Sequence, residues 1–207
     1  AVTVRAGSKA EMALTDGTFV HLNAATNLEY DVNNSKQRLV KLSGEAFFDV
    51  AKNPDCPFKV IINDLQIEVV GTSFNVKTYK KDIVETSLLS GRIRISGGSL
   101  PHEYTLSPGQ KATYSAMDRT LRISKADAHV EAGWRDNYLI FESTPLIDVI
   151  AQIERWYGVE IRLHHKQIAQ DLLSGSFRNE SIQNVIRSLS IQYGFKYEIH
   201  KDIITIY

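Results

Sequence analysis

Several features that are common in proteins are missing from this sequence. It contains 1 cysteine, Cys56, so no disulfide can form within the chain and no cysteine cluster can hold zinc. No apolar run approaches the roughly 20 residues needed to cross a bilayer, and no signal peptide is recognisable. The 24 basic residues equal the 24 acidic ones, so the basic excess typical of nucleic-acid binders is missing. Because the chain opens on a strand-like stretch without an initiating methionine, we expect it to be a soluble piece of a longer protein.

Motifs of catalysis and cofactor binding are missing as well. None of the patterns GxSxG, HExxH, GxxxxGK(S/T) or GxGxxG occurs. His164 and His165 are adjacent, but neighbours in a strand point to opposite faces and chelate one metal poorly. Cys56 lies between two prolines, and the sequence nominates no base to activate it. We therefore expect no enzyme activity, no metal and no cofactor.

The first 125 residues are rich in strand patterns. In FKVIINDLQIEVV (58–70), every second position is apolar on either side of an Asn-Asp turn, as in a hairpin with one buried face. Other strand patterns occur at 18–23, 38–42, 45–50, 73–79, 83–89, 92–96, 111–115 and 120–124. No helical period is evident before residue 125, so we predict an all-β N-terminal domain over residues 1–125.

Glycines precede several of these strand patterns. The main ones are Gly44, Gly71, Gly91 and Gly109, with Gly17 as a weaker member. Glycine tolerates a positive φ, which lets a chain turn a corner before the next strand. The spacings between the main four are 27, 20 and 18 residues, too irregular for a strict repeat. We predict a short β-solenoid or a two-sheet stack.

The character of the sequence changes at residues 126–137, a polar, mixed stretch that we interpret as a linker. Beyond it, RWYGVEIRL (155–163) is echoed by IQYGFKYEI (191–199). The positions that match at an offset of 36 include 141 with 177, 146 with 182, 149 with 185, 150 with 186, 153 with 189, 157 with 193 and 158 with 194. Residues 138–207 therefore contain one supersecondary unit twice.

Each copy of this unit has the pattern of a strand, a helix and a strand. The apolar face of the first helix is formed by positions 146, 149, 150, 153 and 157. Thr144 and Ser181 are the expected N-caps, with Pro145 as the first residue of the first helix. Gly158 and Gly194 are expected to end the two helices.

Strands flank both predicted helices. The strands before the helices are expected at 138–142 and 172–177, those after them at 159–163 and 195–199, and a final strand at 202–207. The final strand can form a hairpin with the one before it. We therefore predict an α+β domain of duplicated β-α-β units over residues 138–207, with both helices packed on one small sheet.

Ordered motifs across the chain resemble the periplasmic part of FecR-type anti-sigma regulators. Within residues 7–115 these motifs are LTDGTFVHLNAATNLEY, RLVKLSGEAFFDVAKNPDCPFKV, EVVGTSFNVKTY, LLSGRIRI and LSPGQKATY. GWRDNYLIFESTPLIDVIAQIERWYGVEI resembles the continuation in the Bacteroidetes branch, except that Asn137 stands where many members have glycine. The duplicated unit is similar to the short domain at the N-termini of secretins and of transducing TonB-dependent receptors.

The resemblance implies a role in signal transduction. Regulators of this type have a cytoplasmic segment that holds an extracytoplasmic-function sigma factor, one membrane helix, and a periplasmic part. That part receives a signal from the signalling domain of a TonB-dependent outer-membrane transporter. This chain would be the periplasmic sensor region of such a membrane-anchored protein. It would not bind nucleic acid, and it would reach the sigma factor and the membrane only through segments outside the chain.

A partner-binding site can be proposed in the C-terminal domain. The last strand, 202–207, is rich in β-branched residues, and at a sheet edge it could pair with a strand of another protein. Trp156 lies at the margin of the helical stripe, where an aromatic side chain could anchor a partner. The hypothesis names Trp156, Ile203, Ile204, Thr205, Ile206 and Tyr207. A core-edge position for the tryptophan and an interior position for the strand are the alternatives.

Two other classes of protein remain open. A carbohydrate-binding β protein with an appended interaction domain would need aromatic residues clustered on one β face, and the candidates Phe47, Tyr79 and Tyr104 are scattered along the sequence. A hydrolase would need two or more close carboxylates in a deep pocket, and nothing in the sequence indicates one.

Overall fold

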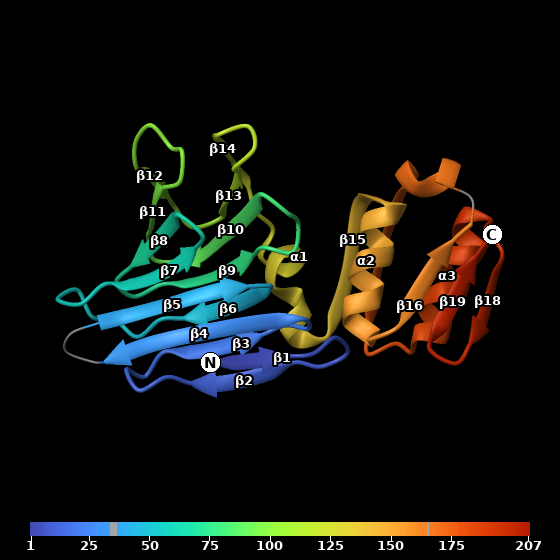
Figure 1. Ribbon diagram of the computed structural model, residues 1–207, viewed down its shortest axis with the longest axis horizontal. Coiled ribbons are helices and arrows are strands. Elements are labelled where there is room, and N and C mark those ends of the chain that lie inside the picture. Colours follow the sequence, from blue (N-terminus) through green and yellow to red (C-terminus); the bar gives the residue numbers. More distant parts are fainter. Residues whose placement is uncertain (34–36, 165) are drawn as a thin grey trace. The chain divides into compact units, whose positions relative to one another are not determined.

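The computed structural model describes residues 1–33, 37–164 and 166–207, which form two compact units (Figure 1). Unit 1 contains Ala1–Val4 and Lys9–Ala132, and unit 2 contains Arg5–Ser8 and Gly133–Tyr207. The division falls inside the polar stretch 126–137, most of which is helical. A short helix, α1 (Ala128–Ala132), belongs to unit 1, and a 3-10 helix, η1 (Gly133–Asp136), belongs to unit 2.

Unit 1 is built from two seven-stranded sheets. The first sheet has the order β1 (Val2–Val4), β4 (Thr26–Asn33), β5 (Gln37–Ser43), β7 (Phe58–Ile62), β8 (Leu65–Val69), β11 (Ile93–Gly97) and β12 (Tyr104–Leu106). The second has the order β14 (Thr120–Lys125), β13 (Gln110–Ser115), β10 (Ile83–Ser90), β9 (Ser73–Lys77), β6 (Glu45–Asp49), β3 (Phe19–Leu22) and β2 (Ala10–Ala13). The predicted two-sheet arrangement is therefore confirmed.

The order of the strands explains why the sequence also suggested a solenoid. The chain passes repeatedly from one sheet to the other and adds one or two strands each time, so the strand numbers rise steadily along both sheets. The described strand pairs of unit 1 are antiparallel except for β5 and β7, which are parallel. The chain thus advances as in a solenoid, but most of its neighbouring strands run in opposite directions.

The two sheets enclose one apolar core. Phe48 on β6 is fully buried, and its ring centroid lies 5.8 Å from that of Phe58 on β7 and 5.2 Å from that of Phe74 on β9. In β7 and β8 every second residue is buried. The alternation in residues 58–70 therefore identified the face that packs between the sheets.

Glycines at the strand starts have two different roles. Gly44, Gly91 and Gly109 have positive φ, as predicted. Gly71 does not, and a Cβ there would lie 2.9 Å from the Cα of Lys52, so glycine is required by the close approach of another segment. Asn137 has a φ of 62°, a conformation that asparagine adopts more easily than most residues.

Unit 2 contains two helices of equal length and two small sheets. Helices α2 (Leu146–Tyr157) and α3 (Ile182–Tyr193) are offset by 36 residues, as the repeat predicted. One sheet pairs β15 (Tyr138–Pro145) with β17 (Leu172–Arg178), and the other has the order β16 (Glu160–Leu163), β19 (Ile203–Ile206) and β18 (Tyr197–His200). A 3-10 helix, η2 (Lys166–Gln170), precedes β17.

The expectation that both helices pack on one sheet is wrong. The strands that precede the helices form one sheet, and the strands that follow them form another. Residues of both helices and of both sheets share a single core, which includes Leu139, Ile153, Leu189 and Ile204.

The ends of the helices follow the predictions except at the start of α2, where Thr144 is not the N-cap and Pro145 is not the first helical residue. Gly158 and Gly194 end α2 and α3 in the left-handed conformation, and the Ser181 side chain accepts a hydrogen bond from the N–H of Asn184. Thr144, however, does not cap α2, because Pro145 occupies the N-cap position. The Thr144 hydroxyl instead bonds the main chain two residues earlier.

These caps lead to a first prediction. Ser181→Ala should lower the free energy of unfolding by about 1 kcal/mol, because an N–H of the first turn of α3 loses its partner. Thr144→Ala is the matched control and should cost less, since its hydroxyl satisfies no N–H of α2. Urea unfolding followed by the fluorescence of the two tryptophans, both in unit 2, measures the difference. Equal losses would contradict the assignment of the caps.

Candidate protein-interaction site

The strand that was predicted to form a sheet edge lies in the middle of its sheet. β19 pairs in parallel with β16 and antiparallel with β18. Each copy of the repeat contributes one strand after its helix, and β19 fills the space between these two strands. Both main-chain edges of β19 are therefore occupied, and the expectation that residues 202–207 offer an edge to a partner is wrong.

The predicted partner-binding residues of this strand are divided between core and surface. Ile204 and Ile206 are each 1% exposed and belong to the core of unit 2. Ile203, Thr205 and Tyr207 alternate with them and lie on the opposite face. Of these, Tyr207 is the most accessible, at 40% exposed.

The surroundings of Tyr207 and Trp156 differ. The ring of Tyr207 stacks on that of His164, with centroids 5.1 Å apart, and its hydroxyl donates a hydrogen bond to Glu198 Oε2 at 3.2 Å. Partial desolvation and this bond raise the pKa of Tyr207. Trp156 is partly buried and packs against the core of unit 2, so it lies at a core edge. His165 lies outside the described residues.

Four strands of unit 2 lie at sheet edges: β15, β16, β17 and β18. On two of them, a side chain of α2 bonds one outward main-chain group. Gln152 Nε2 donates to the carbonyl oxygen of Ile140 on β15 at 3.3 Å. Glu154 Oε1 accepts a hydrogen bond from the N–H of Ile161 on β16 at 2.7 Å. These contacts occupy groups that an added strand would need.

A residue of α3 protects a third edge. The hydroxyl of Tyr193 accepts a hydrogen bond from the N–H of Ser174 on β17 at 2.6 Å and donates one to the carbonyl oxygen of the same residue at 3.1 Å. The helices that fill the core of unit 2 therefore also cap the edges of β15, β16 and β17.

The remaining edge, β18, has no such cap among the described residues. The N–H of Tyr207 donates to the carbonyl oxygen of Lys196 at 2.8 Å, and the reverse bond is 3.4 Å long. In an antiparallel pair, bonded and non-bonded residues alternate, so the N–H and C=O groups of Tyr197 and Ile199 point away from β19. No described side chain bonds these four groups, which leaves β18 open to an additional strand.

The side chains of β18 give this open edge two different faces. Tyr197 and Ile199 lie opposite Ile206 and Ile204, on the side of the core, and Ile199 remains 36% exposed. Glu198 and His200 alternate with them, on the exposed face of the sheet. We define the β18 edge as residues 197–200.

An apolar cavity lies near the start of β18. It has a volume of about 170 Å³ and is lined by Leu146, Ile168, Asp171, Leu173, Tyr193, Gly194, Phe195 and Tyr207. Gly194 and Phe195 are separated from the β18 edge by one residue, Lys196, and Tyr207 pairs with Lys196. The cavity therefore lies close to the end at which the β18 edge begins.

Two family models match the chain on either side of its central portion. The model described as FecR protein matches residues 1–94, and the model described as FecR, C-terminal matches residues 138–206. The chain belongs to the FecR family. The second match includes the whole of β18 and β19, whereas residues 95–137 lie outside both matches.

Solved structures agree with this assignment. Two crystal structures of a candidate anti-sigma factor from Parabacteroides distasonis, at 1.65 and 2.50 Å resolution, are 29% identical to this FecR protein. Each has a TM-score of 0.89, and each match covers 100% of this chain and 97% of the other. None of the curated proteins matches the chain. As a member of the FecR family, the protein is a regulator of a sigma factor.

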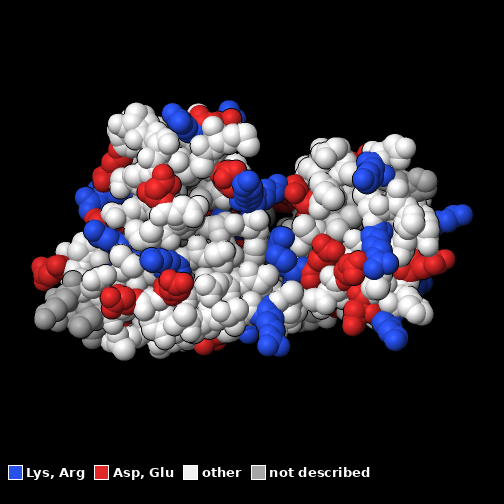
Figure 2. Space-filling model, viewed as in Figure 1, with Lys and Arg blue, Asp and Glu red and all other residues white. Residues whose placement is uncertain are grey.

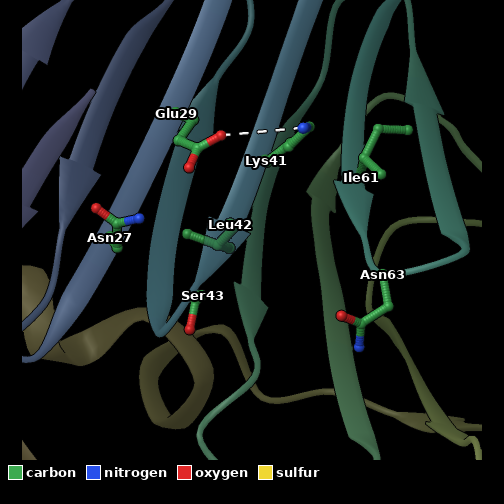
Figure 3. A pocket seen from close by; sticks show the side chains of 7 residues that line it. All are labelled: Asn27, Glu29, Lys41, Leu42, Ser43, Ile61 and Asn63. Carbon is green, nitrogen blue, oxygen red and sulfur yellow. Dashed lines mark ion pairs between the residues drawn. The ribbon is translucent and has the colours of Figure 1, made fainter.

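Unit 1 of this FecR protein has a polar groove on the outer face of its first sheet (Figure 3). The groove has a volume of about 330 Å³ and is lined by Asn27, Glu29, Lys41, Leu42, Ser43, Ile61 and Asn63. Its one carboxylate, that of Glu29, lies 3.9 Å from the ammonium group of Lys41. The groove therefore lacks the pair of close carboxylates that the hydrolase alternative would need.

Three further findings apply to the part of the chain that the structure describes. No group of three metal-ligating side chains occurs there, and no described helix is long and apolar enough to cross a membrane. Phe47 and Tyr104 lie on different sheets, and the Tyr79 hydroxyl donates to the carbonyl of Ala24. They do not form one aromatic face for a sugar. On the face shown in Figure 2, described basic and acidic side chains are interspersed.

Sequence reasoning missed a charged cluster that fixes α1 on unit 1. Lys111 Nζ lies 2.8 Å from Glu85 and 2.9 Å from Glu131 of α1, and Ser87 donates to Glu131 at 3.0 Å. Burial raises the pKa of Glu85, but Lys77 and Lys111 outweigh it, so this pKa lies below its ordinary value. Burial by itself lowers the pKa of Lys111, but the two glutamates outweigh burial, so this pKa lies above its ordinary value. Lys111 is 20 or more positions from both glutamates in the sequence, and no local pattern connects it with them.

Proposed function

We propose that this FecR protein is a periplasmic sensor that receives its signal by strand pairing at the β18 edge. The partner is the signalling domain of a TonB-dependent outer-membrane transporter, and the output is control of an extracytoplasmic-function sigma factor. The role is non-enzymatic. One observation carries the proposal: of the four sheet edges in unit 2, β18 is the one whose outward main-chain groups have no partner among the described residues.

The size of this edge suits a reversible contact. Four main-chain groups at about 0.5–1.5 kcal/mol net each contribute roughly 2–6 kcal/mol. Micromolar affinity requires about 8 kcal/mol, so main-chain pairing alone is too weak. An apolar side chain of the partner that enters the nearby cavity would add about 1.5–3 kcal/mol. The combined contact is then specific, and it can still be released when the transporter changes state.

Ile199→Pro tests the proposal. Proline removes the N–H of residue 199, which points outward, and leaves the bonds between β18 and β19 in place. We expect the affinity for a purified signalling domain of a TonB-dependent transporter from the same organism to fall at least tenfold. Calorimetry measures the affinity, and amide shifts of the labelled FecR protein locate the contact at residues 196–200.

Ile199→Val is the matched control, because it keeps the N–H and most of the side chain. It should bind as the unchanged protein does. Amide spectra of the proline variant must retain the signals of β16 and β19, which establishes that the sheet is still folded. Unchanged binding by the proline variant, or shifts confined to unit 1, would overturn the β18 edge as the site.

A further inference from the structure

Unit 1 also has an open strand edge, in a part of the chain that neither FecR model matches. β14 ends the second sheet and pairs on one side with β13, over all six of its residues (Figure 1). It lies within residues 95–137. This edge is longer than β18, which has four residues.

The outward groups of β14 follow from its register. The N–H of Ala126 donates to the carbonyl oxygen of Gly109 at 2.8 Å, and bonded positions alternate along an antiparallel pair. The main-chain groups of Leu121, Ile123 and Lys125 therefore point away from β13. No described side chain bonds them, so three N–H and three C=O groups are available to another strand.

The core of unit 1 is incompletely covered along this edge. Leu121 and Ile123 lie opposite Tyr114 and Ala112, on the side of the core. Leu121 is partly buried, but Ile123 is 42% exposed. A strand placed beside β14 would cover these side chains with its own apolar residues.

The charged side chains of the edge are all basic. Arg119, Arg122 and Lys125 are exposed and make no ion pair within the described residues. The acidic side chains closest in sequence already accept hydrogen bonds from other groups. Asp118 accepts one from Ser115 at 2.8 Å, and Asp127 accepts one from the N–H of His129. If the β14 strand of a second copy paired with this edge, basic side chains would face basic side chains and repel one another. A strand with acidic side chains is favoured instead.

We propose that β14 binds an extended acidic segment of another protein by strand addition. In that segment, apolar residues that cover Leu121 and Ile123 alternate with glutamate or aspartate residues that face Arg122. This surface shares no residue with the β18 edge and gives the protein a second interaction, through unit 1. It does not depend on which partner binds β18.

A designed peptide tests this surface without knowledge of the natural partner. An acetylated octapeptide of alternating valine and glutamate, added to the isotope-labelled 207-residue chain, should shift the amide signals of residues 120–125. The same peptide with lysine in place of glutamate should bind at least tenfold more weakly. A third peptide, in which proline replaces one central residue of the first, should not bind.

Two variants of the protein separate pairing from charge. Ile123→Pro, which removes an outward N–H, should abolish the shifts, and Ile123→Val should preserve them. Arg122→Glu combined with Lys125→Glu should weaken binding of the valine–glutamate peptide about tenfold and strengthen that of the lysine peptide. Signals of residues 110–115 report whether the sheet remains intact in each variant.

Three results would overturn the proposal. The first is equal binding of the acidic and basic peptides, and the second is a set of shifts that avoids residues 120–125. The third is a concentration-dependent dimer in sedimentation experiments that Ile123→Pro dissociates, because it would make a second copy the occupant of β14. None of these results bears on the variants of the β18 edge.

Discussion

Arg38→Ala is expected to lower the free energy of unfolding by about 3–5 kcal/mol, the usual cost of leaving one member of a buried ion pair alone. The side chain of Arg38 is fully buried, and its Nη1 lies 3.0 Å from Asp16 Oδ2. Its guanidinium also donates to the carbonyl oxygens of Ala51 and Cys56, both at 2.7 Å. Removal of the guanidinium therefore leaves the buried carboxylate of Asp16 without its counter-ion and two carbonyl groups without their donor.

An exposed ion pair on the same strand provides the control. Lys41 lies 3.9 Å from Glu29, and both side chains are more than half exposed. Lys41→Ala should change the free energy of unfolding by about 0–1 kcal/mol. Urea unfolding followed by far-ultraviolet circular dichroism measures both variants. Comparable losses from Arg38→Ala and Lys41→Ala would show that the buried network does not stabilise unit 1.

Gly44→Ala is expected to destabilise unit 1 by about 3–4 kcal/mol, as the sum of two effects. Gly44 has a φ of 117°, which alanine adopts only with strain. In addition, a Cβ at this position would lie 2.6 Å from the Cα of Thr26, which is 1% exposed. Because that neighbour is the main chain of β4 at a buried residue, it cannot move aside without disturbing the strand.

Gly109→Ala separates strain from collision. Gly109 also has a positive φ, 79°, but a Cβ at this position would have no neighbouring atom within 4 Å. Its substitution should therefore cost about 1–2 kcal/mol, the strain contribution alone. The same urea experiment gives both values. A loss for Gly109→Ala as large as that for Gly44→Ala would mean that the close approach to Thr26 relaxes without cost.

The helices of unit 2 could be predicted closely from the sequence. The apolar stripe, the serine cap and the two terminal glycines are local features, and α2 and α3 begin and end where these features place them. Alternation likewise identified the buried face of β7 and β8. Local patterns were misleading at Thr144 and Gly71, where the preceding turn and a distant segment determine what the residue does.

The position of each strand within its sheet could not be predicted in this way. Alternation shows which face of a strand is buried, but it does not show which strand lies beside it. β19 is central because β16, more than 40 residues earlier in the chain, pairs with it. For this reason the open edge is β18 and not β19, and the partner-binding site proposed from the structure lies on β18.

The sequence by itself determined the two-part organisation, the duplicated unit and the membership of the family, because periodicity and ordered motifs are properties of continuous segments. Only the tertiary structure decided which main-chain groups remain available to a partner. Gln152, Glu154 and Tyr193 bond main-chain groups at three edges of unit 2, and Arg38 holds a loop of unit 1, through contacts with residues 7 to 19 positions away in the sequence. Such contacts depend on the folded positions of both partners, and no local pattern records them.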